Sequence, residues 1–157
     1  MSEPRWLVLT WRLPATSSST PRVATWRSLQ RLGAVTLTPG AAVVPYSEHL
    51  LEQLEWIAEE IVQRGGDAYV LPVTELREQD EEDIRRRMRA DAGQAYRQLR
   101  EAADRLARES IERPSFEREL GALQRGLSRA IEKDHFMSGA RASAERAIRQ
   151  ARRRKEA

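Results

Sequence analysis

The chain has 157 residues, which suits one domain or two small ones, and it contains no cysteine. The absence of cysteine excludes disulfides, zinc–thiolate sites, iron–sulfur clusters and cysteine nucleophiles. The net charge of +3 is unevenly spread, because residues 1–76 carry −2 and residues 77–157 carry +5. We therefore predict two domains, an α+β module over residues 1–76 and an arginine-rich helical region over residues 77–157, packed on or beside the module.

No targeting or membrane segment is predicted. The chain begins with a polar stretch over residues 1–5, and the apolar run that follows at residues 7–9 is very short. A secretory signal needs about 7–15 apolar residues, and a membrane-spanning helix needs about 20. We expect a cytoplasmic protein without a membrane partner.

The first predicted elements follow from alternating apolar residues and from the residues that typically begin or end helices. Residues 5–13 predict a central strand, because both of its faces begin with apolar side chains. After a polar loop over residues 15–19, Thr20 is predicted to cap a helix over residues 21–32, with Pro21 at its first position. Gly33 suits the position just after the end of that helix.

A hairpin and a second strand–helix pair follow. Residues 34–45 predict two short strands around a Pro39-Gly40 turn. Ser47 is the predicted N-cap of a second helix, which ends at Gly65-Gly66. Residues 67–74 predict a last strand, placed at an edge because Pro72 lies within it.

The predicted order of elements is therefore β-α-β-β-α-β. This order is typical of the ferredoxin-like split βαβ arrangement, one antiparallel sheet with both helices on one face. The other face then stays open unless the second half of the chain, a second copy or nucleic acid covers it. The fold class is α+β.

The second half predicts helices only. Apolar residues recur at helical spacing over about 80–110, and again after Pro114-Ser115, where Ser115 is the predicted cap. Two long helices in succession imply an antiparallel hairpin. A thinner apolar stripe from Ala140 to Ala151 predicts a short third helix.

Basic side chains in the second half are candidates for binding DNA phosphates, since arginine forks suit phosphate. The alternative explanation for the many arginines is a genome whose base composition favours arginine codons. The candidates form two groups, one near residues 85–89 and a terminal cluster at residues 152–155. Acidic residues one helical turn away are expected to pair with the arginines of the first group, as Glu81 with Arg85 and Glu82 with Arg86. The terminal cluster has no acidic neighbour before Glu156, and the alternative interpretation of this cluster is a frayed, solvated tail. The candidates are Arg85, Arg86, Arg89, Arg152, Arg153, Arg154 and Lys155.

Catalytic and metal-binding patterns are absent. The sequence has no P-loop, GxGxxG, HExxH or GxSxG motif, and the histidines His49 and His135 lie far apart. The acids of residues 80–83 favour a helix start over a metal site. We expect no catalytic residue, metal or cofactor.

The four tryptophans, Trp6, Trp11, Trp26 and Trp56, are interpreted as core and interface residues. An alternative is base stacking on an open sheet, as in RNA-recognition sheets, but residues 41–45 lack the aromatic residues of that fold.

Several segments of the chain together form a recognisable pattern. They are residues 6–14, 21–23, 26–35, 43–45, 116–120 and 134–136. This pattern resembles the N-terminal domain family of the chromate-resistance regulator ChrB, and the resemblance extends over nearly the whole chain. The strand–helix start is also similar to the ferredoxin-like domain of PaaX-type repressors.

The resemblance implies a transcription-associated role in chromate resistance, with DNA as a partner and a further C-terminal domain in full-length relatives. Chromate as effector is implied by the resemblance alone. We expect a non-enzymatic, DNA-binding regulator that forms a homodimer. The alternative is a protein–protein interaction or dimerisation module without DNA binding. A metal-dependent nuclease is disfavoured, because the first strand ends at Thr10-Trp11-Arg12 without an acid.

Overall fold

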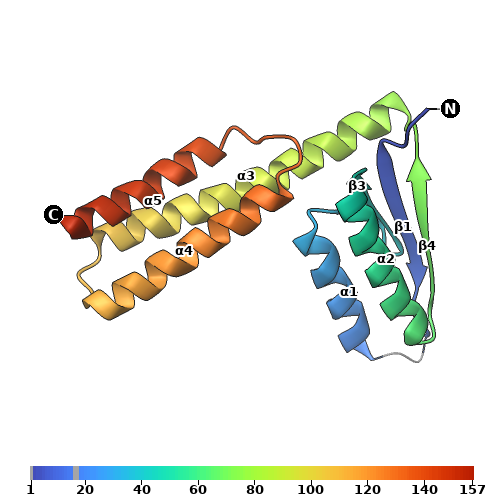
Figure 1. Ribbon diagram of the computed structural model, residues 1–157, viewed down its shortest axis with the longest axis horizontal. Coiled ribbons are helices and arrows are strands. Elements are labelled where there is room, and N and C mark those ends of the chain that lie inside the picture. The colour runs from blue at the N-terminus through green and yellow to red at the C-terminus, as the bar shows by residue number, and fades with distance from the viewer. Residues whose placement is uncertain (1, 16–17) are drawn as a thin grey trace. The chain divides into compact units, whose positions relative to one another are not determined.

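The computed structural model describes residues 2–15 and 18–157. The chain forms two compact units, residues 1–86 and residues 87–157 (Figure 1). Nine elements follow one another in the order β1-α1-β2-β3-α2-β4-α3-α4-α5 within the described ranges. The fold is α+β, as predicted.

The first unit is built on a four-stranded antiparallel sheet with the strand order β2-β3-β1-β4. The register places Leu9 of β1 opposite Ala42 of β3 on one side and Val70 of β4 on the other. The prediction of a central first strand and an edge strand containing Pro72 is confirmed. The strands are β1 (Trp6–Arg12), β2 (Val35–Thr38), β3 (Ala41–Pro45) and β4 (Asp67–Val73).

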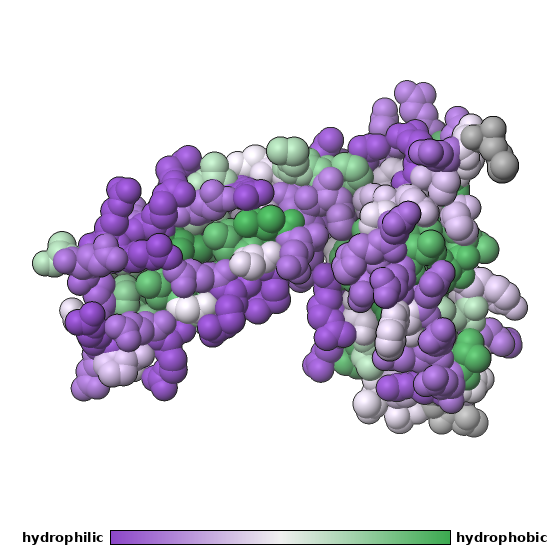
Figure 2. All heavy atoms as spheres, viewed as in Figure 1, coloured by the Kyte–Doolittle hydropathy of each residue, from purple (hydrophilic) through white to green (hydrophobic). Residues whose placement is uncertain are grey.

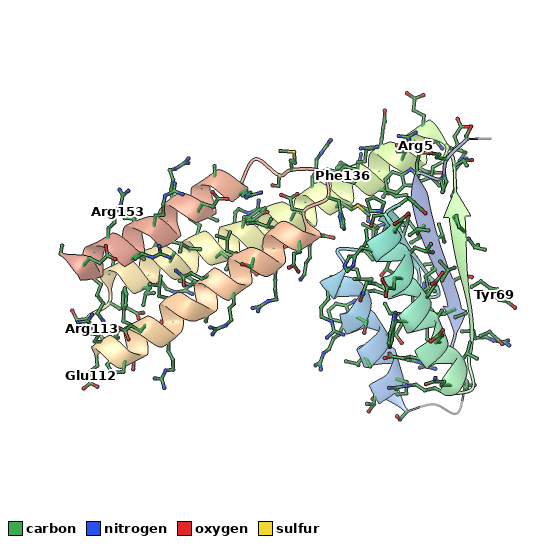
Figure 3. All side chains as sticks on the ribbon, viewed as in Figure 1. Arg5, Tyr69, Glu112, Arg113, Phe136 and Arg153 are labelled. Carbon is green, nitrogen blue, oxygen red and sulfur yellow. The ribbon has the colours of Figure 1, made fainter. Side chains whose placement is uncertain are left out.

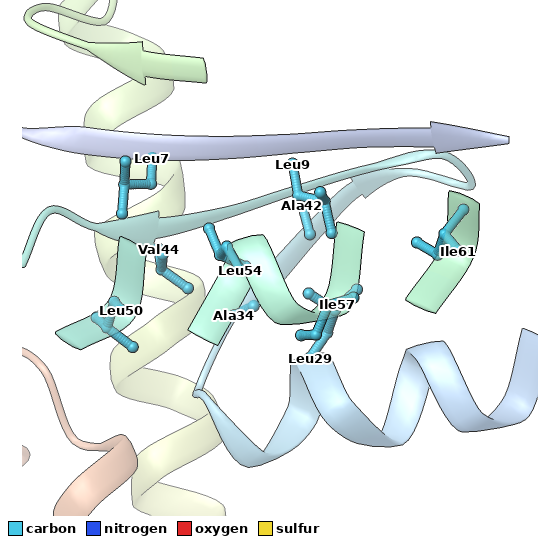
Figure 4. Packing of buried hydrophobic residues seen from close by; sticks show 10 residues of the cluster. All are labelled: Leu7, Leu9, Leu29, Ala34, Ala42, Val44, Leu50, Leu54, Ile57 and Ile61. Atoms are coloured by element: carbon cyan, nitrogen blue, oxygen red, sulfur yellow. The ribbon is translucent and has the colours of Figure 1, made fainter. Parts of the chain in front are cut away.

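Helices α1 (Ser19–Arg31) and α2 (Glu48–Gln63) cover one face of this sheet. Alternate residues of β1 and β3 point toward the helices because side chains alternate along a strand. Figure 4 shows the resulting core, which joins sheet and helices. Its buried members are Leu7, Leu9, Leu29, Ala34, Ala42, Val44, Leu50, Leu54, Ile57 and Ile61.

In the first unit, the helix boundaries agree with the predicted cap and glycine signals at every end but one. The Ser47 hydroxyl accepts a hydrogen bond from the Leu50 N–H at 3.0 Å, which confirms it as the cap of α2. Gly33 has a φ of 69°, the left-handed conformation expected after α1. The prediction of Thr20 as the cap of α1 is wrong, because the helix begins at Ser19 after Ser18. Pro21 is tolerated there because the first-turn N–H groups have no helical partner. Residues 16 and 17 of the predicted loop lie outside the described residues.

The face of the sheet away from α1 and α2 is partly covered by the start of α3 (Glu78–Arg108), which belongs to the first unit up to Arg86. Trp6 is buried on this face, and the Arg85 guanidinium lies 5.5 Å from the centre of its ring. Arg5 donates a hydrogen bond to Glu81 at 2.9 Å. The sheet is therefore not bare at this end of β1.

Two of the four tryptophans are not core residues. Trp6 is buried and Trp11 packs against the core of the first unit. Trp26 and Trp56 are exposed on α1 and α2. The interpretation as core residues is confirmed for Trp6 and Trp11; Trp26 and Trp56 lie outside the core, and an interface role for them stays a prediction.

The second unit is a three-helix arrangement of α3, α4 (Arg113–Lys133) and α5 (Arg141–Glu156). Ala92 and Tyr96 of α3 pack with Ala130 of α4 and Ala144 of α5. Figure 2 shows apolar side chains in the seam between helices whose outer surfaces are polar. The prediction of Ser115 as a helix cap is wrong, since α4 begins two residues earlier and Ser115 lies in its first turn.

Candidate functional site

The basic charge of the second half is concentrated in one helix. Helix α5 contains seven basic and two acidic residues, a net charge of +5. That equals the whole net charge of residues 77–157, so the rest of this half is electrically balanced. The basic surface of the second half is therefore the exposed side of α5.

Helix α5 is held by a stripe of small apolar residues. Its buried residues are Ala144, Ala147, Ile148 and Ala151. Ala144 packs near Tyr96 of α3, and Ile148 packs near Ala103, which lies about two turns further along α3. Because later residues of α5 meet later residues of α3, the two helices run parallel and end at the same end of the unit (Figure 1).

A groove lies between these two helices near their C-terminal ends. It has a volume of about 470 Å³. We call it the arginine groove; α3 lines it with Asp104, Ala107 and Arg108, and α5 lines it with Gln150, Arg153 and Arg154. The spacing of i, i+3 and i+4 places each set of three on one helical face. Figure 3 shows Arg153 projecting from α5.

The three arginines of the groove are exposed and available for an anion. Within residues 2–15 and 18–157, none of them forms an ion pair within 4 Å, although Asp104 lines the same groove. Each helix C-terminus adds roughly half a negative charge. Three guanidinium charges exceed one carboxylate and two helix ends, so a positive charge of about one remains for an external phosphate.

The predicted terminal cluster divides among three environments. Arg153 and Arg154 line the arginine groove. Arg152 is exposed but does not line it. The Lys155 ammonium lies 4.1 Å from the centre of the Phe116 ring and is thereby directed toward α4. The cluster is helical up to Glu156, so the interpretation as a frayed tail is not supported.

The predicted basic residues at the start of α3 are largely engaged by acids. Arg85 donates to Glu81 at 2.9 Å, and this hydrogen bond, despite partial burial, holds the pKa of Glu81 below its ordinary value. Arg86 pairs with Asp83, so the predicted partner Glu82 is wrong. Arg89 is exposed. Arg85 and Arg86 belong to the first unit, whereas the other candidates belong to the second.

Arg108 is the one arginine of the groove that was not predicted from the sequence. It stands three residues after Arg105 in the last turn of α3, where basic residues complement the helix dipole. The basic last turn of α3 is therefore the sequence signal that could have indicated Arg108 as a candidate. Its meeting with Arg153 and Arg154 depends on the parallel packing of α3 and α5, which spacing along the chain does not reveal.

A second polar cluster fixes the connection between α4 and α5. The buried Tyr96 hydroxyl donates to Asp134 at 3.0 Å, and the Asp134 carboxylate also accepts from the Ser138 N–H at 2.9 Å. Burial, followed by the bond to Asp134, raises the pKa of Tyr96 above its ordinary value. These contacts orient the start of α5 and so help to position the arginine groove.

Metal-binding clusters and membrane-spanning helices are both absent from the described part of the chain. Residues 2–15 and 18–157 contain no group of three or more histidine or acidic side chains placed to hold a metal ion. No helix in those ranges is long and apolar enough to span a bilayer. In the acidic segment at the start of α3, Asp80 is bound by Arg77 at 2.8 Å.

Fold and groove together define an α+β protein with a basic three-helix unit. Comparison with known sequences gives the family: the chain belongs to the family described as "Protein ChrB, N-terminal", whose sequence model matches residues 22–157. The predicted resemblance is confirmed.

A relative called Protein ChrB, from Cupriavidus metallidurans, is 35% identical over 83 residues. This match covers 53% of the present chain and 25% of the relative's length. No solved structure matches the chain.

Proposed function

We propose that this protein is a non-enzymatic, cytoplasmic regulator of transcription that binds DNA phosphates through the arginine groove. The observation that carries the proposal is the convergence, at one end of the second unit, of three arginines that form no ion pair within the described residues. Membership of the ChrB N-terminal family supports a chromate-resistance setting. The proposal takes the first unit as a ferredoxin-like module, supported by its order of elements and by its strand order.

The chemistry of the groove suits phosphates better than bases. Guanidinium groups bind phosphate oxygens bidentately, and such contacts supply affinity without sequence readout. Arg153 and Arg154 are adjacent on α5, and Arg108 faces them from α3. Three cations around one groove therefore fit neighbouring phosphates of a duplex strand, while specificity requires further contacts.

The test measures duplex affinity by fluorescence anisotropy over a salt series, using the DNA upstream of the protein's own gene. The groove variant carries Arg108→Gln, Arg153→Gln and Arg154→Gln. Each phosphate contact contributes about 0.9 to the slope of log affinity against log salt. We expect the groove variant to lower the steepness of that slope by about 2–3.

A matched control carries Arg113→Gln, Arg118→Gln and Arg125→Gln, which remove the same charge from the exposed surface of α4. The control should keep the slope of the unmodified protein. Equal loss in both variants would show that only net charge matters, and no binding at low salt would exclude DNA as the partner. If the arginines only stabilise the C-terminal ends of the helices, the groove variant will have a lower melting temperature and an unchanged affinity for DNA.

The proposal includes a homodimer, which would bring two copies of the groove to one duplex. Analytical ultracentrifugation with and without DNA measures the state directly. A monomer in both conditions would remove the dimer from the proposal. Incubation of the duplex with magnesium should leave it uncut, and cleavage would contradict the non-enzymatic role.

A further inference from the structure

The two edges of the sheet are protected to different degrees. Edge strands expose unpaired backbone groups and are usually shortened, bulged or charged. Strand β2 has four residues and a register irregularity between Thr36 and Thr38. Strand β4 has seven residues in continuous register with β1, and only its first residue, Asp67, is charged. Charge and proline protect β4 only near its two ends, at Asp67 and Pro72, so the edge between Ala68 and Leu71 lacks the usual protection.

Backbone bonds show which residues of β4 face outward. The Trp11 N–H donates to Gly40 and the Tyr46 N–H donates to Arg5, both at 2.9 Å. Within β1, odd-numbered residues therefore bond toward β3 and even-numbered residues toward β4. Arg5 lies just before the strand and departs from this pattern, because its N–H donates to the Val73 carbonyl at 2.9 Å.

With Val8 opposite Leu71, the odd-numbered residues of β4 bond to β1, and Ala68, Val70 and Pro72 turn their backbone groups outward. Pro72 agrees with this assignment, because it has no N–H to give to β1. The free edge thus offers the N–H groups of Ala68 and Val70, with three carbonyls.

A groove runs beside this edge. It has a volume of about 420 Å³. Helix α2 lines it with Glu55, Ala58, Glu59, Val62 and Gln63, and β4 lines it with Ala68 and Val70. The same two strand residues therefore present outward backbone groups and form the groove floor. We call this surface the α2–β4 groove.

The α2–β4 groove is apolar at its floor and acidic at its rim. Val62 is 55% exposed, which leaves an apolar side chain open to solvent beside the strand. Glu55 and Glu59 stand one helical turn apart, and neither forms an ion pair within the described ranges. On the opposite face of β4, Tyr69 is 66% and Leu71 is 46% exposed (Figure 3 labels Tyr69).

We propose that the α2–β4 groove binds an extended segment of a partner protein, which adds to the sheet as a strand beside β4. Residues of that segment would alternate between two faces. Those facing α2 are arginine or lysine, whose stems cover Ala58 and Val62 and whose charges reach Glu55 and Glu59. Those on the other face are apolar and contact Tyr69 and Leu71.

Charge and backbone chemistry select this occupant. The acidic rim repels nucleic acid phosphates, so DNA is not the partner here. A second copy added by a two-fold axis at Val70 would bring its own Glu55 and Glu59 to the same place, where four carboxylates would repel one another. Pro72 of that copy would also leave each Ala68 carbonyl without a backbone donor. A basic partner strand has neither defect.

The experiment uses the full chain and a capped, fluorescein-labelled hexapeptide that alternates valine and arginine. Affinity is measured by anisotropy, and backbone protection by hydrogen exchange with NMR detection. We expect the peptide to slow exchange of the Ala68 and Val70 amides. The Tyr69 and Leu71 amides already bond to β1 and should change little. A peptide with alternate N-methylation should bind at least about fivefold more weakly.

Two variants locate the contact. Val70→Pro removes one outward N–H without touching the ladder to β1, and we expect about a fivefold loss of affinity. Glu55→Gln with Glu59→Gln should weaken binding about tenfold at low salt, and less at high salt. Glu52→Gln with Glu60→Gln removes the same charge from exposed positions of α2 outside the groove, and should bind normally. Tryptophan fluorescence checks that each variant is folded.

Three results would overturn the proposal. Peptide affinity that is unchanged both in Val70→Pro and in the Glu55→Gln, Glu59→Gln double variant would show that the peptide binds elsewhere. Protection of Ala68 and Val70 by duplex DNA would make nucleic acid the occupant. A dimer that Val70→Pro disperses would make a second copy the occupant. None of these outcomes bears on the arginine groove, because its residues lie in the second unit.

Discussion

Replacing Tyr96 with phenylalanine removes one buried hydroxyl and leaves the ring in place. The hydroxyl donates to Asp134 at 3.0 Å, while Asp134 also accepts from the Ser138 N–H. A hydrogen bond to a charged group contributes about 1.5–3 kcal/mol. Because Asp134 keeps its second donor, we expect the free energy of unfolding of the second unit to fall by about 1–2 kcal/mol.

The positions of the tryptophans make this measurement specific. All four lie in residues 1–86, and the second unit has none. In a urea titration, tryptophan fluorescence therefore reports the first unit, and far-ultraviolet circular dichroism reports the helices of both. With a slope near 1 kcal/mol per molar urea, the helical transition of Tyr96→Phe should shift down by about 1–2 M.

A double-mutant cycle decides whether the bond itself is the cause. Asp134→Ala removes the acceptor, and in that background Tyr96→Phe should cost about 1 kcal/mol less than in the unmodified protein. An equal cost in both backgrounds, or an unchanged helical midpoint, would refute the assignment of stability to this contact.

Three further predictions concern the fold. Burial raises the pKa of Tyr96, so the stability that the protonated hydroxyl contributes is complete below about pH 10 and is lost as pH rises through the folded-state pKa. In alkaline denaturation, the unmodified protein should lose up to about 1.4 kcal/mol per pH unit more than Tyr96→Phe. Parallel plots of unfolding free energy against pH for the two proteins would contradict this. Leu54→Ala in the sheet core should cost about 2–5 kcal/mol by tryptophan fluorescence, whereas a cost below 1 kcal/mol would mean that the core collapses around the cavity. Ser47→Ala should cost about 1 kcal/mol in the same assay, and Ser47→Thr, which keeps the hydroxyl, should restore most of it.

The sheet module follows from the sequence because its signals are local. Apolar alternation marks β1, the Pro39-Gly40 turn marks the hairpin, and the Ser47 hydroxyl caps α2 where the sequence places it. Pro72 indicates the edge, since a central strand needs an N–H that proline lacks. The start of α1 was misplaced because Ser18, Ser19 and Thr20 are all acceptable near a helix start, and their order alone does not select one.

The candidate site was only half predictable, because it depends on packing between helices. Arg153 and Arg154 stand out as a terminal basic cluster, but Arg108 reaches them only through the parallel pairing of α3 and α5. Lys155 is next to Arg154 in the sequence but does not line the groove, because its ammonium group lies over the Phe116 ring. Arg86 likewise pairs at a spacing of three residues, although a spacing of four was also open to it. Rotamers and neighbouring helices decide such choices.

The alanine stripe of α5 has a thermodynamic consequence. Three of the four buried residues of this helix are alanine, so α5 buries little apolar surface when it docks. The arginine groove exists only while α5 is docked, because half of its lining comes from that helix. A polyanion that binds the groove therefore also stabilises the docked position of α5. Occupancy of the groove by the polyanion and docking of α5 are linked equilibria. Heparin or short duplex DNA should act as a thermal stabiliser of the second unit, and warming should weaken binding by releasing α5 before the rest of the protein unfolds.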